Sequence, residues 1–556
     1  MARVRAGRCL PLATSSCHAN VGIVLIPSSL PTALPVQASS AIAFGTWNYT
    51  VLFIYLGAMV AVGVWLTRKQ KTSEEYFLAG RRMPWLVVSM SMFASLTSAI
   101  SYMGIPSRAY EENISMIAGF MAGPIVAILL IVLFLPFYHR LRVTTSYEYI
   151  DKRFGQPARF SVSGLFILAR LGWLGTVIFA PAKALEVATG IDLYLAILLM
   201  GALATSYTAL GGLRAVLWTD VAQFLILVGG AVWVGVSLLQ AVPDGFDGIW
   251  RIASESGRTG GFHWRINLFE MTAITAIVAT FLTTTQDYGT DQVTVQRLLS
   301  VKSFRGMAKA VLLNSVFDIV IVAMLLFLGL GMFAYFTTYP ERLGDGIEKD
   351  KLLPFYIMHA LPQGVSGLII AAIFAAAMSS MDSGIHSLST VITNDFVRPL
   401  RPHGPTKDSD RFDLILARIL VVGLGLVGTL VAFWVSSFTH LLEAASAVLG
   451  LFNGPILSLF LLGVLTRRGR FGGWLVGALC GILVTLMLQA LDFSDGTVRL
   501  FSRGENPVKV HWYYYFPASF FTSLLVGYSI SLLMGSDPAA KELTVWRRRD
   551  LATRDG

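Results

Sequence analysis

The chain has 556 residues and a formal net charge of +10; 55% of its residues are hydrophobic and only 14% are charged. Soluble domains carry about 25% charged residues, so the composition excludes an ordinary soluble protein. Lys and Arg stand in short segments between long apolar runs, which is typical of membrane topology and not of a nucleic-acid-binding face. The cysteines Cys9, Cys17 and Cys480 have no metal-site spacing and form no disulfide framework.

Apolar runs of roughly 20 residues, the length that crosses a bilayer, recur along most of the chain. We predict an all-α membrane protein with about 13 transmembrane helices. In the ninth range, which is long for one crossing, we expect a short outer helix before the span. Residues 1–45 differ in composition, and we predict an N-terminal tail or a signal segment there. The predicted ranges are 48–67, 84–107, 117–138, 159–186, 191–209, 214–241, 269–293, 306–336, 353–391, 412–436, 438–466, 471–491 and 512–534.

The loops between these runs alternate in charge. Basic residues follow every second run, as in Arg81 and Arg82 or Arg140 and Arg142, whereas the intervening loops are acidic or mixed. Excess Lys and Arg mark the cytoplasmic side. We therefore predict a multi-pass protein of the inner (plasma) membrane, with its N-terminus outside and a cytoplasmic tail at 536–556.

Two predicted spans carry small and polar residues on one helix face. In the second span these are Ala94, Thr97, Ser98 and Ser101, spaced as neighbours on a helix. Two interpretations stay open: a packing seam of small residues, or a locally opened helix whose oxygens coordinate a hard cation. In the ninth span the shared face is made by Ala376, Ser379, Ser380 and Ser383, with Asp382 beside it. Packing explains the alanines but not the carboxylate, which costs about 2.5–3.5 kcal/mol at a helix centre.

Three further polar features interrupt apolar runs. Asp220 follows the break at Gly211-Gly212 and lies about 13 Å along the next helix; it is either a functional carboxylate or the partner of a base such as Arg214. The polar run 283–292 indicates an unwound helix, a cytoplasmic exit or a helix end in water. Arg170 either neutralises a solute carboxylate, snorkels or pairs with an Asp. Asp318 has no role that the sequence predicts.

At these residues the chain resembles the sodium:solute symporter family, which carries sugars, sialic acids, monocarboxylates, iodide and vitamins. The resemblance covers roughly residues 48–535 and rests on the order and spacing of several motifs rather than on one of them. The motifs are Tyr76-Phe77-Leu78-Ala79-Gly80-Arg81, Gly104-Ile105-Pro106-Ser107, Tyr147-Glu148-Tyr149 with Arg153-Phe154, Thr208-Ala209-Leu210-Gly211-Gly212-Leu213 with Trp218-Thr219-Asp220 and Gln223, Gln292 with Val295-Gln296-Arg297, and Met378-Ser379-Ser380.

The resemblance implies a leucine-transporter-like fold, in which the core helices form two inverted five-helix repeats. On this sequence the repeats would span 84–241 and 269–466, with an extracytoplasmic loop at 242–268 between them. An extra first helix and its cytoplasmic loop would occupy 46–83. Two C-terminal helices would occupy 467–535.

The resemblance also implies two ion sites. The shared sodium site would use the carbonyls of Ala94, Thr97 and Ala376 and the hydroxyls of Ser379 and Ser380. A possible second cation site, known in sialic acid carriers, would use Asp220, Ser379, Asp382 and Ser383. Asp382 stands where such members have a hydroxyl, which either strengthens the second site or makes it sensitive to protons. Ion stoichiometry, and sodium against proton coupling, are therefore open.

For the solute, the resemblance implies Ser98 and Ser101 on one side and Phe281 and Thr284 opposite, with Arg170 available to an anion. These positions favour an organic anion, such as sialic acid or a monocarboxylate, over a sugar.

The function that follows is a sodium-coupled secondary active symporter, which imports a small organic solute by alternating access. Sodium is the coupling ion, and we expect no other cofactor. The alternative is a transporter-like membrane sensor that works with a separate signalling partner. We expect no enzyme, because the sequence shows no phosphate-binding loop, no zinc-protease motif and no nucleophile elbow with plausible partners. The oligomeric state is open.

Overall fold

The computed structural model describes residues 44–67, 72–343, 347, 351–401, 407–436, 441–492, 499–500, 509–535 and 543–546. All of them belong to one compact unit, Ile42–Gly556. Among the residues described, the regular structure is helical apart from a short ribbon, in which β1 (Leu491–Asp492) pairs antiparallel with β2 (Arg499–Leu500). The predicted all-α class is confirmed. The predicted segment 1–45 and the tail 536–556 lie almost wholly outside the described residues.

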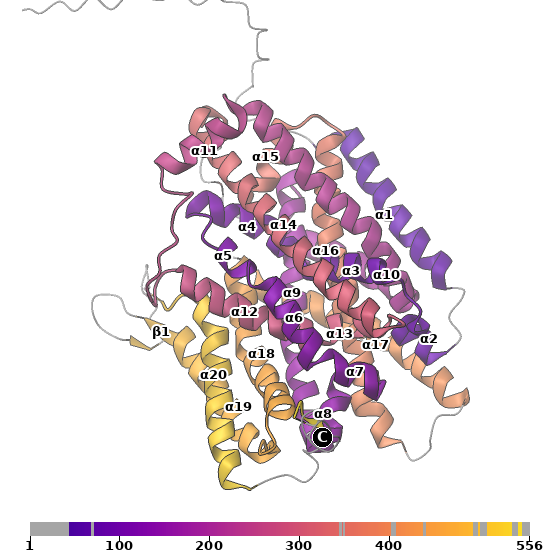
Figure 1. The fold of residues 1–556 in the computed structure, drawn as a ribbon. Coiled ribbons are helices and arrows are strands. Elements are labelled where there is room, and N and C mark those ends of the chain that lie inside the picture. Colours follow the sequence, from indigo (N-terminus) through magenta and orange to yellow (C-terminus); the bar gives the residue numbers. More distant parts are fainter. Residues whose placement is uncertain are drawn as a thin grey trace, which may run out of the picture. The chain divides into compact units, whose positions relative to one another are not determined.

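The described part of this unit contains twenty α-helices, which Figure 1 shows packed together. The long helix α10 contains a break at Gly212, where φ is +55°; glycine adopts this conformation without a steric penalty. The helices are α1 (Thr46–Thr67), α2 (Ser73–Leu78), α3 (Trp85–Leu96), α4 (Ala99–Glu111), α5 (Ile117–Phe120), α6 (Gly123–Leu133), α7 (Leu135–Leu141), α8 (Tyr147–Phe154), α9 (Gln156–Thr189), α10 (Leu193–Ala241), α11 (Gly245–Glu255), α12 (Ala273–Gly289), α13 (Gln292–Leu299), α14 (Phe304–Thr338), α15 (Leu352–Ala360), α16 (Val365–Val391), α17 (Lys407–Val435), α18 (Leu441–Leu465), α19 (Phe471–Ala490) and α20 (Tyr515–Leu533).

Each predicted span coincides with one of these helices, with part of one or with a short series of them. The expected short helix before the ninth span is α15. By length and composition, nine of the described helices suffice to cross a membrane, or ten if α3 and α4 together form one broken span. The predicted count of 13 is therefore not established and stays a prediction.

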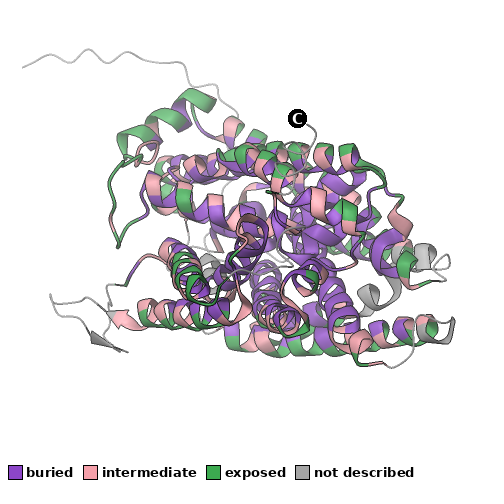
Figure 2. Ribbon diagram, turned by 60° about the horizontal axis from the view of Figure 1, so that its bottom comes forward, coloured by how far each residue is buried: buried purple, intermediate pink, exposed green. Residues whose placement is uncertain are grey.

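The outward faces of the helices are apolar. On α17 the side chains of Ile419, Leu426 and Leu430 are 62–67% exposed, and on α19 Leu479 and Leu483 are 56–58% exposed. Figure 2 shows that exposed residues lie along the outer helices and buried residues on the inner ones. Contiguous exposed apolar surface of this kind is costly in water and suits a lipid environment.

Helix α16 forms the centre of the packing. It contacts α1, α3, α9, α10 and α17, and every residue from Ile369 to Val391 is buried. The run Ala375-Ala376-Ala377 has side chains short enough for neighbouring helices to approach closely. The polar side chains of this helix therefore face protein rather than lipid.

Helices α19 and α20 pack backbone against backbone at Gly473, Gly477 and Gly481, which are spaced one turn apart. A Cβ atom on Gly477 would lie 2.4 Å from the carbonyl oxygen of Ser523. We expect Gly477→Leu to destabilise the fold by about 1–3 kcal/mol or more through overpacking, seen as a lower thermal midpoint in detergent. Gly423→Leu is the matched control, because no atom lies within 4 Å of a Cβ there. Equal midpoints for the two variants would contradict this packing.

Candidate functional site

A break between α3 and α4 opens the backbone inside the protein. The two helices meet at an angle of 61°, and the break consists of Thr97 (ψ 86°) and Ser98 (ψ 170°). The last carbonyls of a helix have no partners within it. The oxygens around Ala94 and Ser95 are thus available to the neighbouring helix, although both residues are buried.

The hydroxyls of α16 meet this break. Ser379 Oγ donates to the carbonyl oxygen of Ala94 at 2.6 Å and to that of Ala376 at 3.1 Å, and Ser380 Oγ donates to the carbonyl oxygen of Ser95 at 2.9 Å. The structure therefore brings four of the predicted sodium ligands together, from segments 285 positions apart. Thr97, the fifth, lies in the break itself.

A second polar network lies beside this site and is built around Arg297 of α13. Its guanidinium contacts Asp220 Oδ2 at 3.0 Å, Ser91 Oγ at 2.9 Å and also Ser383 Oγ. Arg297 and Asp220 are 1% and 0% exposed. The partner of Asp220 is thus Arg297 and not Arg214. Of the possible second cation site, Asp220 and Ser383 contact this fixed cation, while Ser379 and Asp382 are buried on α16.

Arg170 on α9 is buried and forms an ion pair with Asp291. Asp291 also caps α13 by accepting from the backbone N–H of Val293 at 2.8 Å. The guanidinium carbon of Arg170 lies 4.4 Å from the centre of the Trp173 ring. Pairing with an Asp, one of the alternatives that the sequence left open, is the arrangement found.

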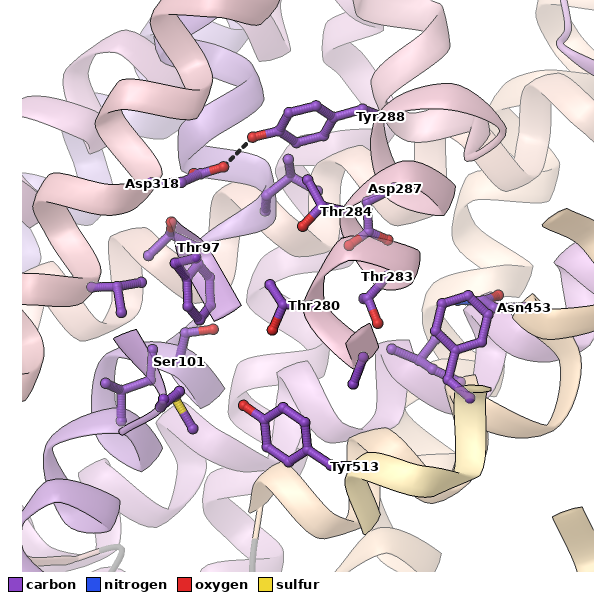
Figure 3. A pocket seen from close by; sticks show the side chains of 18 of the residues that line it. Thr97, Ser101, Thr280, Thr283, Thr284, Asp287, Tyr288, Asp318, Asn453 and Tyr513 are labelled. Carbon is purple, nitrogen blue, oxygen red and sulfur yellow. Dashed lines mark hydrogen bonds between the residues drawn. The ribbon is translucent and has the colours of Figure 1, made fainter. Parts of the chain in front are cut away.

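A cavity of about 270 Å³ adjoins the break, and none of its described lining residues belongs to α16. The charged residues that line it are Asp287 of α12 and Asp318 of α14 (Figure 3). Asp318 accepts from the Tyr288 hydroxyl and, at 3.2 Å, from Asn314 Nδ2. The other polar lining residues are Thr97, Ser101, Thr280, Thr283, Thr284, Tyr288, Asn453 and Tyr513.

The predicted solute-contacting residues divide into two groups. Ser101 and Thr284 line the cavity, and Ser98, Phe281 and Arg170 do not. Ser98 immediately precedes α4 and is buried. Phe281 packs on a small apolar cluster that contains Leu282 and Phe516.

Sequence reasoning missed several cavity residues. Asp287 lies in the polar run 283–292, for which we predicted an unwound helix, a cytoplasmic exit or a helix end in water. In the structure α12 continues through Asp287 to Gly289. Asp318 was the one acidic residue in an apolar span, and that isolation was the available signal. Asn453 lies in the middle of α18, and a lone Asn inside a predicted span was the available signal. Tyr513 carried no such signal, because Tyr is common where a span begins.

The sequence model of the sodium:solute symporter family matches residues 76–481. The chain belongs to this family. It is 31% identical to the sodium/sialic acid symporter of Proteus mirabilis, over 80% of this chain and 89% of that protein. It is 32% identical to the sodium-coupled monocarboxylate transporter 2 of Bos taurus, over 80% of this chain and 72% of that protein.

A solved structure agrees with this assignment. The substrate-bound, outward-open state of a Na⁺-coupled sialic acid symporter matches with a TM-score of 0.79 and 29% identity, and covers 89% of this chain and 99% of that one. The predicted leucine-transporter-like fold is confirmed for this member of the sodium:solute symporter family. The exact limits of the two inverted repeats and of the other segments stay predictions.

Proposed function

We propose that this sodium:solute symporter family member is a sodium-coupled secondary active symporter that imports a small organic solute by alternating access. The observation that carries the proposal is the contact of the Ser379 and Ser380 hydroxyls with the open carbonyls at the end of α3. Carbonyl and hydroxyl oxygens are suitable ligands for a hard cation. Sodium would insert between them and be held by Ala94, Thr97, Ala376, Ser379 and Ser380.

Thr97 links the ion to the solute in this proposal. Its carbonyl belongs to the proposed ion site, while the residue also lines the cavity. An ion that fixes the break between α3 and α4 also fixes Thr97 and, one turn later, Ser101. Sodium therefore prepares the cavity, and because it binds the prepared state better, it couples the two events.

The driving force suits active import. One charge that crosses about 100 mV gains about 2.3 kcal/mol, and a tenfold sodium gradient adds about 1.4 kcal/mol. Together, ~3.7 kcal/mol supports about 500-fold accumulation of a neutral solute for each sodium ion.

We also propose one sodium ion per cycle. The possible second site (Asp220, Ser379, Asp382 and Ser383) already has a fixed cation, because Arg297 contacts both Asp220 and Ser383. A second ion there would meet a guanidinium at close range, and like charges in a buried site repel strongly.

The proposal includes the location of the protein and its orientation in the membrane. The protein lies in the plasma (inner) membrane with its N-terminus outside and its C-terminus in the cytoplasm, as the loop charges favour. It is a carrier and not an enzyme, and it has no nucleic-acid partner. The relatives carry names of transporters, so the sensor alternative gains no support from them.

Purified protein in liposomes tests the proposal. An inward sodium gradient with a negative interior should drive concentrative uptake of a solute found by sodium-dependent thermal stabilisation. Removal of the sodium gradient should lower the accumulation of the solute, and so should removal of the membrane potential. Equal accumulation when potassium replaces sodium on both sides would contradict sodium coupling.

A further inference from the structure

The cavity has an acidic lining. Asp287 and Asp318 face it from α12 and α14 (Figure 3), and none of its described lining residues is a Lys, Arg or His. Both carboxylates are half-buried and lie within helices. A carboxylate that is withdrawn from water is disfavoured unless a positive charge or several hydrogen bonds compensate it.

The surroundings supply little of that compensation to Asp287. The groups that act electrostatically on Asp287 are Asp291, Arg170 and Asp318. Arg170 already pairs with Asp291, so Asp287 shares this guanidinium with a second carboxylate. Asp318 has hydrogen bonds from Tyr288 and Asn314, whereas within the described part of the chain no donor contacts Asp287.

Other lining groups suit a positively charged ligand. The rings of Phe120, Trp512, Tyr513 and Phe516 border the cavity, and aromatic faces attract ammonium groups. Thr97 is only 6% exposed, borders the cavity, and its hydroxyl has no hydrogen-bond partner among the described residues. This buried polar group, independent of the two acids, is available to a ligand with donors.

We propose that the transported solute carries a protonated amine or quaternary ammonium group, which Asp287 and Asp318 bind inside this cavity. The inference rests on the proposed function and specifies its solute class. An anion without such a group would face two carboxylates and no free base among the described lining residues. This solute class differs from the sialic acid and the monocarboxylates in the names of the relatives.

The test is a thermal-shift screen of the purified full-length protein in sodium. The probes are choline, glucosamine and other amine-bearing solutes. Each probe is compared with a neutral analogue and with a carboxylate analogue. For glucosamine these are N-acetylglucosamine and glucuronate. Only amine-bearing probes should stabilise the protein. For the best probe, Asp287→Asn should raise the apparent Kd about thirtyfold, whereas Glu255→Gln, on the exposed end of α11, should leave it unchanged.

The outcomes separate this inference from the proposed function. Sodium-dependent stabilisation by a carboxylate or neutral probe, with no response to amines, would overturn the solute class and leave sodium symport intact. No response to any amine-bearing probe would also overturn it. An unchanged Kd in both Asp287→Asn and Asp318→Asn would remove the assigned binding residues even if an amine binds.

Discussion

Ser380→Ala should raise the sodium concentration for half-maximal uptake at least about tenfold, because it removes one oxygen from the proposed ion site. A tenfold change corresponds to about 1.4 kcal/mol, within the range for one good ligand or hydrogen bond. The fold should survive, since the lost hydrogen bond from Ser380 to the Ser95 carbonyl contributes only about 1 kcal/mol. Uptake into liposomes as a function of sodium measures the effect.

Ser387→Ala is the matched control on the same helix. Ser387 is also buried, but its hydroxyl donates to the carbonyl of Gly384 within α16, at 2.9 Å. It should keep the wild-type sodium dependence. If Ser380→Ala and Ser387→Ala had the same sodium activation as the wild type, Ser380 would not be a ligand.

The second large effect is expected at Arg297. Arg297→Met leaves Asp220 buried, at 0% exposure, without its guanidinium, and breaking a buried ion pair in this way costs about 3–5 kcal/mol. The thermal midpoint in detergent should fall sharply, together with transport activity.

The double variant Arg297→Met with Asp220→Asn separates the charge from the packing. Removing both charges should restore most of the lost thermal midpoint, because replacing a whole buried pair is often neutral. A double variant as unstable as Arg297→Met alone would show that Arg297 acts through its shape and its contacts with Ser91 and Ser383 instead.

Much of the fold follows from the sequence because membrane helices leave a simple signal. Apolar runs of about 20 residues and alternating loop charges indicate where helices begin and which side they face. The number of crossings is harder, because α3 and α4 form one bent pair, and α10 joins two predicted spans across Gly212. Helix breaks depend on tertiary contacts that a hydropathy pattern does not contain.

The candidate site was predicted only in part, because its polar helix faces have a local signal in the sequence and its ionic partners do not. Same-face spacing identified the polar faces of α3–α4 and α16, and the resemblance paired them, so Ser379 beside Ala94 was expected. The ionic partners of Asp220 and Arg170 were not expected. Arg297 is 77 positions from Asp220, and Asp291 is 121 positions from Arg170; nothing local in the sequence selects one base for one acid. The acidic cavity depends on such pairings, since Arg170 would otherwise be free to bind an anion.

Equilibrium binding of radioactive sodium to the purified protein, without solute or gradient, tests the central claim most directly. We expect saturable binding of about one ion per chain, retained in Ser387→Ala and lost in the double variant Ser379→Ala with Ser380→Ala. Undiminished sodium binding by a folded double variant would contradict the site between α3 and α16.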